Sequence, residues 1–213
     1  MFSRLAFWKT KGLNPAVIYD IGANNGGWTQ EARSVFPQAR YEEFEANRDH
    51  ARPGRHTVLL GDSEREVQFH KAVKPTCQTN TGASIYLEAT DHYRPGTYTS
   101  ESLPMVPLDV YATRASLPPP DLLKLDVQGA ELDVLRGAET LLQTTKCVLL
   151  EASLHRWNKD APMIEEVIAF LAARGFELID IADTHSTQGY LFQVDLIFAH
   201  VSTGLRKQAF YLR

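Results

Sequence analysis

Five acidic residues stand at or near the ends of predicted strands, where their carboxylates could act on a ligand. They are Asp20, Glu45, Asp62, Asp126 and Glu151. Ligands of open α/β sheets bind beyond the carboxyl ends of the strands. Unpaired carboxylates buried at one such edge would each cost several kcal/mol or become neutral. Their grouping therefore predicts a site for a molecule that carries hydroxyls, amines or a positive charge.

A glycine-rich turn follows the first of these carboxylates. We expect residues 17–21 to form a buried strand, Gly22, Gly26 and Gly27 to form the turn, and Trp28 to open a helix. Glycine lets the backbone approach a ligand closely, and the start of a helix offers unpaired N–H groups. The strand, turn and helix together are typical of a platform for a nucleotide cofactor.

The turn differs from the dinucleotide fingerprint G-x-G-x-x-G. Asn24 replaces the middle glycine, which in that fingerprint lets a pyrophosphate approach the backbone. Asp20, ahead of the turn, would repel phosphates and favour a cationic ligand. The pattern points to S-adenosylmethionine, which has a sulfonium, an amino-acid end and no phosphate. A NAD(P)-dependent oxidoreductase is the alternative enzyme.

Two further carboxylates fit the same ligand. Glu45 ends the second predicted strand, where an acid can bind a ribose diol. The alternative interpretation is that Glu45 is a solvated acid at a strand end with no ligand. Asp62 is placed to meet an adenine amino group, and the alternative is an Asx-turn after Gly61.

The elements that must position these residues alternate between strand and helix. Predicted strands cover 17–21, 40–45, 56–60, 66–70, 105–110, 122–127, 146–151, 176–181 and 191–198, and predicted helices start at Trp28 and cover 132–142 and 162–174. The last two strands have no helix between them, so we expect them to be antiparallel. The pattern predicts a doubly wound α/β fold, a mostly parallel sheet with one antiparallel strand in a C-terminal hairpin.

The main domain is expected to cover residues 17–200. Residues 1–16 form a lead-in segment, rich in aromatic side chains, that should pack on the sheet, and 201–213 form a basic tail expected to be solvated. Residues 74–107 are rich in Thr, Ser, Gly and Pro. This segment is predicted to be a substrate loop or lid with little regular structure.

Composition limits the classes of partner. The formal net charge of −4 over 213 residues argues against a general nucleic-acid binder. Cys77 and Cys147 make neither a disulfide framework nor a zinc motif. The sequence shows no signal peptide and no apolar run long enough to span a membrane. We therefore expect a cytoplasmic protein without nucleic-acid partners or stable membrane insertion, and the sequence predicts no oligomeric state.

Four blocks of sequence carry a family resemblance. They are DIGANNGGWT from Asp20, FEAN from Phe44, TGAS from Thr81 and KLDVQGAELDVLRGA from Lys124. The chain resembles, from about Val17 to Phe198, the FkbM family of S-adenosylmethionine-dependent methyltransferases. The resemblance implies a class I, Rossmann-like methyltransferase fold and O-methylation of a hydroxyl on a sugar, polyketide or related small metabolite. The chain departs from the family pattern at Ala46, where proline is usual, and at Gln128, where an acid is common.

The resemblance also implies roles for particular residues. Those that would hold the methionine end are Asp20, Gly22, Ala23, Asn24 and Gly26, and we place Trp28 and Thr29 in the same cofactor-binding set. Glu45 would bind the ribose and Asp62 the adenine side. Asp126 and Glu131 would face the methyl group and the substrate.

Catalysis of such a transfer needs a group that takes the proton of the acceptor alcohol. Asp126 is the first candidate, and Lys124, two residues before it on the same strand face, would set its charge state. His155, four residues after Glu151, is a second candidate base. We expect no metal, although Asp126, Glu151 and His155 could together bind Mg²⁺. A catalytically inactive S-adenosylmethionine-binding protein is the third possible function.

Overall fold

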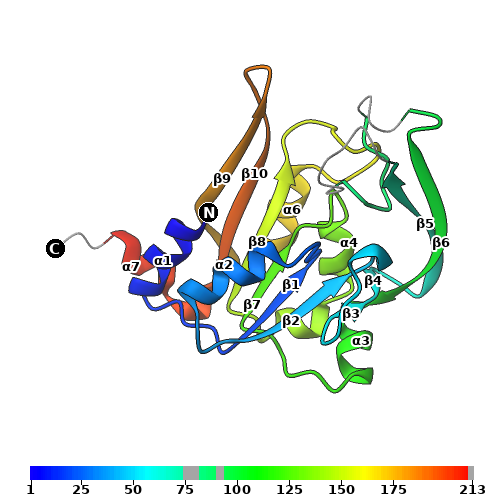
Figure 1. Cartoon of the computed structure of the whole chain (residues 1–213). Helices are drawn as coiled ribbons and strands as arrows, with labels where there is room; N and C mark the ends of the chain where they lie inside the picture. The colour runs from blue at the N-terminus through cyan, green and yellow to red at the C-terminus, as the bar shows by residue number, and fades with distance from the viewer. Residues whose placement is uncertain (74–81, 90–93, 211–213) are drawn as a thin grey trace.

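The structure is a computed structural model that describes residues 1–73, 82–89 and 94–210. Its centre is a seven-stranded sheet in the order β3-β2-β1-β7-β8-β10-β9 (Figure 1). The strands are β1 (Val17–Ile21), β2 (Arg40–Glu45), β3 (His56–Thr57), β7 (Leu122–Leu125), β8 (Cys147–Ser153), β9 (Phe176–Thr187) and β10 (Tyr190–His200). All pairs are parallel except those of β10, which runs antiparallel to both β8 and β9. The predicted sheet with one reversed strand in a closing hairpin is confirmed.

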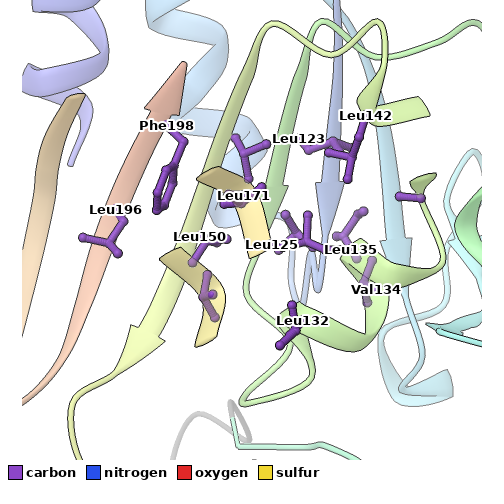
Figure 2. Close-up of a cluster of buried hydrophobic side chains, with 14 of the residues drawn as sticks. Leu123, Leu125, Leu132, Val134, Leu135, Leu142, Leu150, Leu171, Leu196 and Phe198 are labelled. Carbon is purple, nitrogen blue, oxygen red and sulfur yellow. The ribbon is translucent and has the colours of Figure 1, made fainter. Parts of the chain in front are cut away.

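Helices cover both faces of this sheet. Successive side chains of a buried strand point to opposite faces, so each face carries apolar side chains that a helix must cover. Leu122 faces a core formed with α1 (Phe2–Thr10) and α2 (Gly27–Val35). Leu123 faces the other core, formed with α4 (Glu131–Arg136), α5 (Glu139–Leu142) and α6 (Ile164–Ala172). Figure 2 shows this second core, where Leu123, Leu150 and Phe198 meet side chains from the helices.

A second sheet of three strands, in the order β4-β6-β5, corrects two expectations. The predicted strand 56–60 divides between β3 in the main sheet and β4 (Leu59–Gly61) in the small one. The predicted strand 105–110 ends at Pro107, because α3 (Leu108–Arg114) begins there. The expected edge strand exists as β5 (Arg65–Ala72).

The segment 74–107 is more regular than the sequence indicated. Its last ten residues form β6 (Tyr98–Pro107), the central strand of the small sheet, so the prediction of little regular structure is wrong there. Residues 74–81 and 90–93 lie outside the described part of the chain. The role of this segment as a substrate loop or lid stays a prediction.

The predicted helix 132–142 is broken into α4 and α5 at Gly137. A Cβ at this position would lie 1.9 Å from the carbonyl oxygen of Gly61. The close backbone approach between α4 and β4 therefore needs glycine, and glycine weakens the helix at that point.

Both ends of the described chain pack against the sheet. Leu5 and Trp8 of α1 are fully buried, and Trp8 Nε1 donates a 2.7 Å hydrogen bond to Asp180 Oδ2 on β9. Leu205, the first residue of α7 (Leu205–Phe210), is also buried, so the tail is not solvated throughout as expected. None of the helices in the described ranges is long and apolar enough to cross a membrane.

Candidate functional site

A cavity of about 430 Å³ opens at the carboxyl ends of β1, β2 and β7. Among the predicted cofactor-binding residues, those that line it are Gly22, Ala23, Asn24, Trp28, Glu45 and Asp126. Its size falls within the range of small-molecule and cofactor sites. The sequence pattern thus brings together most of the set that it assigned to one ligand.

The turn after β1 forms one wall of the cavity. Gly22 has a φ of +77°, and a Cβ there would lie 1.9 Å from the carbonyl oxygen of Asp126. The backbone of Asp126 is held at this point by its N–H, which donates to Ile21 O at 3.0 Å. Gly26, with a φ of +85°, is the N-cap residue of α2 and does not line the cavity. The first glycine lets two strand ends meet, and the second turns the chain into the helix.

Glu45 both lines the cavity and fixes its shape. Its Oε2 accepts a hydrogen bond from the backbone N–H of Asn24, and its Oε1 accepts one from Asn47 N, each at 2.7 Å. Glu45 is only 9% exposed. A carboxylate oxygen accepts more than one hydrogen bond, so a ligand hydroxyl can still bind here.

Asp20 and Lys124 form a buried ion pair beneath the turn. Lys124 Nζ lies 2.9 Å from Asp20 Oδ1 and donates to Gly22 O at 3.2 Å. Asp20 Oδ2 accepts a 2.7 Å hydrogen bond from Thr29 Oγ1. Asp20 and Thr29 are not part of the cavity wall. In this structure Asp20 and Thr29 connect the turn to α2 on the side away from the cavity. Their contact with the cofactor stays a prediction.

Lys124 also reaches toward the exposed acid of the site. Its Nζ lies 3.6 Å from Asp126 Oδ2 and 5.7 Å from the ring centre of Trp28. Burial lowers the pKa of Lys124, but the charges of Asp20 and Asp126 outweigh it and hold the pKa above that of an ordinary lysine. Lys124 therefore remains a cation beside the side chain of Asp126.

Asp126 is the acid that the fold presents to a ligand. Its side chain is 43% exposed, in contrast to the fully buried Asp20. Its Oδ1 accepts a 2.7 Å hydrogen bond from Gln128 Nε2. Gln128, where the resemblance led us to expect an acid, therefore orients Asp126 and lines the same cavity.

Glu131 has a supporting position behind the loop after β7. Its Oε1 accepts from Val127 N at 2.8 Å, and its Oε2 accepts from Gly129 N at 3.0 Å. Burial raises the pKa of Glu131 to about 7. Glu131 does not line the cavity, so its predicted position facing the methyl group has no support from this geometry.

Two other predicted residues also lie away from the cavity wall. Asp62 accepts hydrogen bonds from Arg65 and, at 3.0 Å, from Ser63. Burial opposes the shift, but these two partners lower the pKa of Asp62. His155 is exposed and does not line the cavity.

Three residues in or beside the cavity wall were not assigned to the site by the sequence analysis. Asn47 Nδ2 and His50 Nε2 are buried and find no hydrogen-bond partner in the part of the chain that the structure describes. Both residues line the cavity. Buried Arg55 joins the two segments, since its Nη1 donates to Asn24 O and, at 2.9 Å, to His50 O. Asn47 ends the FEAN block of the family resemblance, two residues after Glu45, whereas His50 and Arg55 had no signal in the sequence.

The ligand set considered for Mg²⁺ is not brought together. Within residues 1–73, 82–89 and 94–210, the group of side chains with ligand atoms within metal-binding reach is Glu151, His185 and Asp195. Asp126 and His155 do not belong to that group. His185, on β9, is the histidine that lies beside Glu151, where we had expected His155.

Comparisons with known proteins bear on the family and the fold of the chain. A family model described as the methyltransferase FkbM domain matches residues 20–178. The structure is similar to the methyltransferase FkbM from Methylobacillus flagellatus KT, with a TM-score of 0.54 and 13% identity, over 86% of this chain and 43% of that chain. This chain thus spans less than half the length of that protein. The shared fold confirms the predicted class I methyltransferase fold.

The chain is also similar to other solved methyltransferase structures. Magnesium protoporphyrin IX methyltransferase from Synechocystis PCC 6803, solved with bound S-adenosylmethionine, has a TM-score of 0.49 and 13% identity, over 93% of this chain and 77% of that chain. A comparison with curated protein sequences finds no significant match. The family model covers most of the chain, and the chain therefore belongs to the methyltransferase FkbM domain family.

Proposed function

We propose that this protein is an S-adenosylmethionine-dependent methyltransferase that methylates a hydroxyl group of a small metabolite such as a sugar or polyketide. The observation that carries the proposal is one continuous cavity lined by Gly22, Glu45 and Asp126. These residues supply, in that order, a close backbone approach, an acceptor for a diol and an exposed carboxylate. Family membership supports the same donor.

The residues of the cavity fit the proposed cofactor. Gly22 leaves space that a Cβ would fill, and Glu45 offers carboxylate oxygens to ribose hydroxyls. The unpaired Nδ2 of Asn47 can donate to a ring nitrogen or a hydroxyl oxygen, and His50 Nε2 can donate or accept, depending on its tautomer. Leaving such buried atoms unpaired costs about 1–3 kcal/mol each, so a bound partner would relieve that cost.

The apolar side of the cavity suits a flat base. Phe44, Val58, Leu60 and Phe69 line it, and each comes from a different part of the two sheets or the loop between them. We assign the adenine ring to this side. Asp62, which the sequence assigned to adenine, is held by Arg65 outside the lining.

The cofactor would supply a methyl group on a sulfonium, and the chain supplies positioning and a proton acceptor. Asp126, which lies 3.6 Å from Lys124 Nζ and is oriented by Gln128, can accept the proton of an acceptor hydroxyl. General-base catalysis of this kind contributes roughly 10²–10⁴-fold. Holding the donor carbon and acceptor oxygen about 3 Å apart and in line contributes more.

A labelled-methyl assay tests the proposal. The purified protein is incubated with S-adenosylmethionine labelled in its methyl group and with separate panels of hydroxyl-bearing and amine-bearing metabolites. We expect label in one or more hydroxyl acceptors, together with S-adenosylhomocysteine. Transfer confined to amines would overturn the O-methylation part, and donor binding without transfer to any acceptor would favour an inactive binding protein.

A further inference from the structure

Three side chains with metal-ligand chemistry converge on the other half of the sheet. Glu151 lies on β8, Asp195 on β10 and His185 on β9, three strands that lie side by side (Figure 1). Asp195 is the register partner of Glu151, and His185 is the register partner of Gln193. The backbone of one continuous sheet therefore fixes their mutual positions.

The distances between the ligand atoms suit a bound cation. His185 Nε2 lies 2.9 Å from Asp195 Oδ2 and 3.9 Å from Glu151 Oε2. One ligand atom from each residue lies within 4.8 Å of the other two. Ligands about 2.0–2.2 Å from a common ion lie roughly 3–4 Å apart, depending on the angle between them. Small side-chain adjustments would bring all three onto one ion.

A neighbouring side chain holds the first of these carboxylates in place. Gln193 Nε2 donates a 2.6 Å hydrogen bond to Glu151 Oε1, which leaves Oε2 facing His185. The side chains of Glu151 and Asp195 are 12% and 8% exposed, whereas that of His185 is 39% exposed. Outer partners that fix ligand carboxylates are typical of metal sites, and the exposed imidazole leaves a path from solvent.

Neither carboxyl group of the cluster forms an ion pair with a lysine or arginine in the described part of the chain. In the described ranges, the ion-pair partner of both Glu151 and Asp195 is His185. Burial, with the charge of Asp126 adding to it, raises the pKa of Glu151 to about 9. Burial also raises the pKa of Asp195. A divalent cation bound between the two carboxyl groups would favour their ionised forms and displace the proton that burial favours.

We propose that Glu151, His185 and Asp195 bind a divalent transition-metal cation such as Mn²⁺ or Zn²⁺. An imidazole with two carboxylates suits such ions, whereas Mg²⁺ and Ca²⁺ prefer oxygen ligands alone. The site is distinct from the donor cavity, which none of the three residues lines. It nevertheless lies close to Asp126, since Asp126 and Glu151 directly follow the register partners Leu125 and Leu150. The inference concerns metal binding and goes beyond the proposed methyl transfer.

Titration of the full-length protein with Mn²⁺ tests the site. After chelator treatment and its removal, MnCl₂ is added while calorimetry measures heat and electron paramagnetic resonance measures free Mn²⁺. We expect one bound Mn²⁺ per chain, with Kd at least tenfold higher in His185→Ala and Asp195→Asn. Thermal melts test whether each variant is folded. His185→Ala should perturb the fold least, because the side chain of His185 is 39% exposed.

Two matched variants test whether Mn²⁺ binding depends on these three side chains in particular. His155→Ala removes an exposed histidine of the alternative set, and Glu177→Gln removes a carboxylate elsewhere on β9. Both should bind Mn²⁺ like the unmodified protein. The proposal is overturned if neither Mn²⁺ nor Zn²⁺ binds, or if His155→Ala loses binding while His185→Ala keeps it. Binding of S-adenosylmethionine, measured on the same samples, keeps this result separate from the proposed methyl transfer.

Discussion

Lys124 Nζ lies 2.9 Å from Asp20 Oδ1, and both side chains are almost completely removed from solvent. The pair lies directly beneath the turn that shapes the candidate cofactor cavity, because Lys124 also donates to Gly22 O. One buried cation thus serves the turn, the strand-end acid Asp20 and the exposed acid Asp126. The arrangement connects the stability of the fold with the electrostatics of the site.

Lys124→Met should destabilise the protein by about 3–5 kcal/mol, because it leaves Asp20 as an uncompensated buried charge. Lys146→Met is the matched control, since its ion pair with Asp121 is largely exposed on the lysine side and should cost less than about 1 kcal/mol. Urea unfolding measures both free energies. Equal, small losses in the two variants would show that the Lys124–Asp20 pair does not support the fold.

Gly22→Ala should abolish measurable S-adenosylmethionine binding or raise its Kd more than tenfold. The new Cβ would meet the carbonyl oxygen of Asp126 at 1.9 Å, and alanine is strained at a φ of +77°. Gly54→Ala is the control, because Gly54 has a similar φ of +80° but no atom within 4 Å of its Cβ position. Similar binding by the two variants would contradict the close approach of β1 and β7.

Asp126→Asn should lower turnover at least 100-fold while the Kd for S-adenosylmethionine changes less than about threefold. The substitution keeps the shape of the side chain but removes the proton acceptor. Single-turnover kinetics and calorimetry give the two quantities separately. Equal losses of affinity and turnover would place Asp126 in cofactor binding alone.

The buried Glu131 should make stability depend on pH. Its folded pKa of about 7 lies above the ordinary glutamate pKa of 4.5, so the unfolded chain releases the proton first as pH rises. Stability should therefore fall between about pH 4.5 and pH 7, by up to roughly 3 kcal/mol, and change little from this group above that range. In Glu131→Gln, which cannot ionise, the fall in stability between about pH 4.5 and pH 7 should be smaller. An identical fall in both proteins would rule out Glu131 as its source.

The parts of the fold that follow local rules could be predicted from the sequence. Buried strands with apolar runs, the turn at Gly22 and the closing hairpin all depend on residues near one another in the chain. The departure of β4 into a second sheet and the break at Gly137 could not be predicted. Each depends on which distant backbone lies alongside, and periodicity carries no information about that partner.

The candidate site shows the same division. The sequence placed five acids at one edge, but burial separates their roles: Asp20 is paired beneath the turn, whereas Asp126 faces the cavity. Spacing alone could not distinguish a buried position inside a strand, as for Asp20 in β1, from the first residue beyond a strand, as for Asp126 after β7. His185 comes from a hairpin far along the chain, so nothing local linked it to Glu151.

Calorimetric titration with S-adenosylmethionine tests the central claim most directly. We expect one molecule bound per chain, at least tenfold weaker binding in Glu45→Gln, and a change of less than threefold in Asp62→Asn, because Glu45 lines the cavity and Asp62 does not. NADH and NADPH, titrated in parallel, should give no comparable heat. Absence of binding by both S-adenosylmethionine and S-adenosylhomocysteine, or tighter binding of a nicotinamide cofactor, would contradict the account.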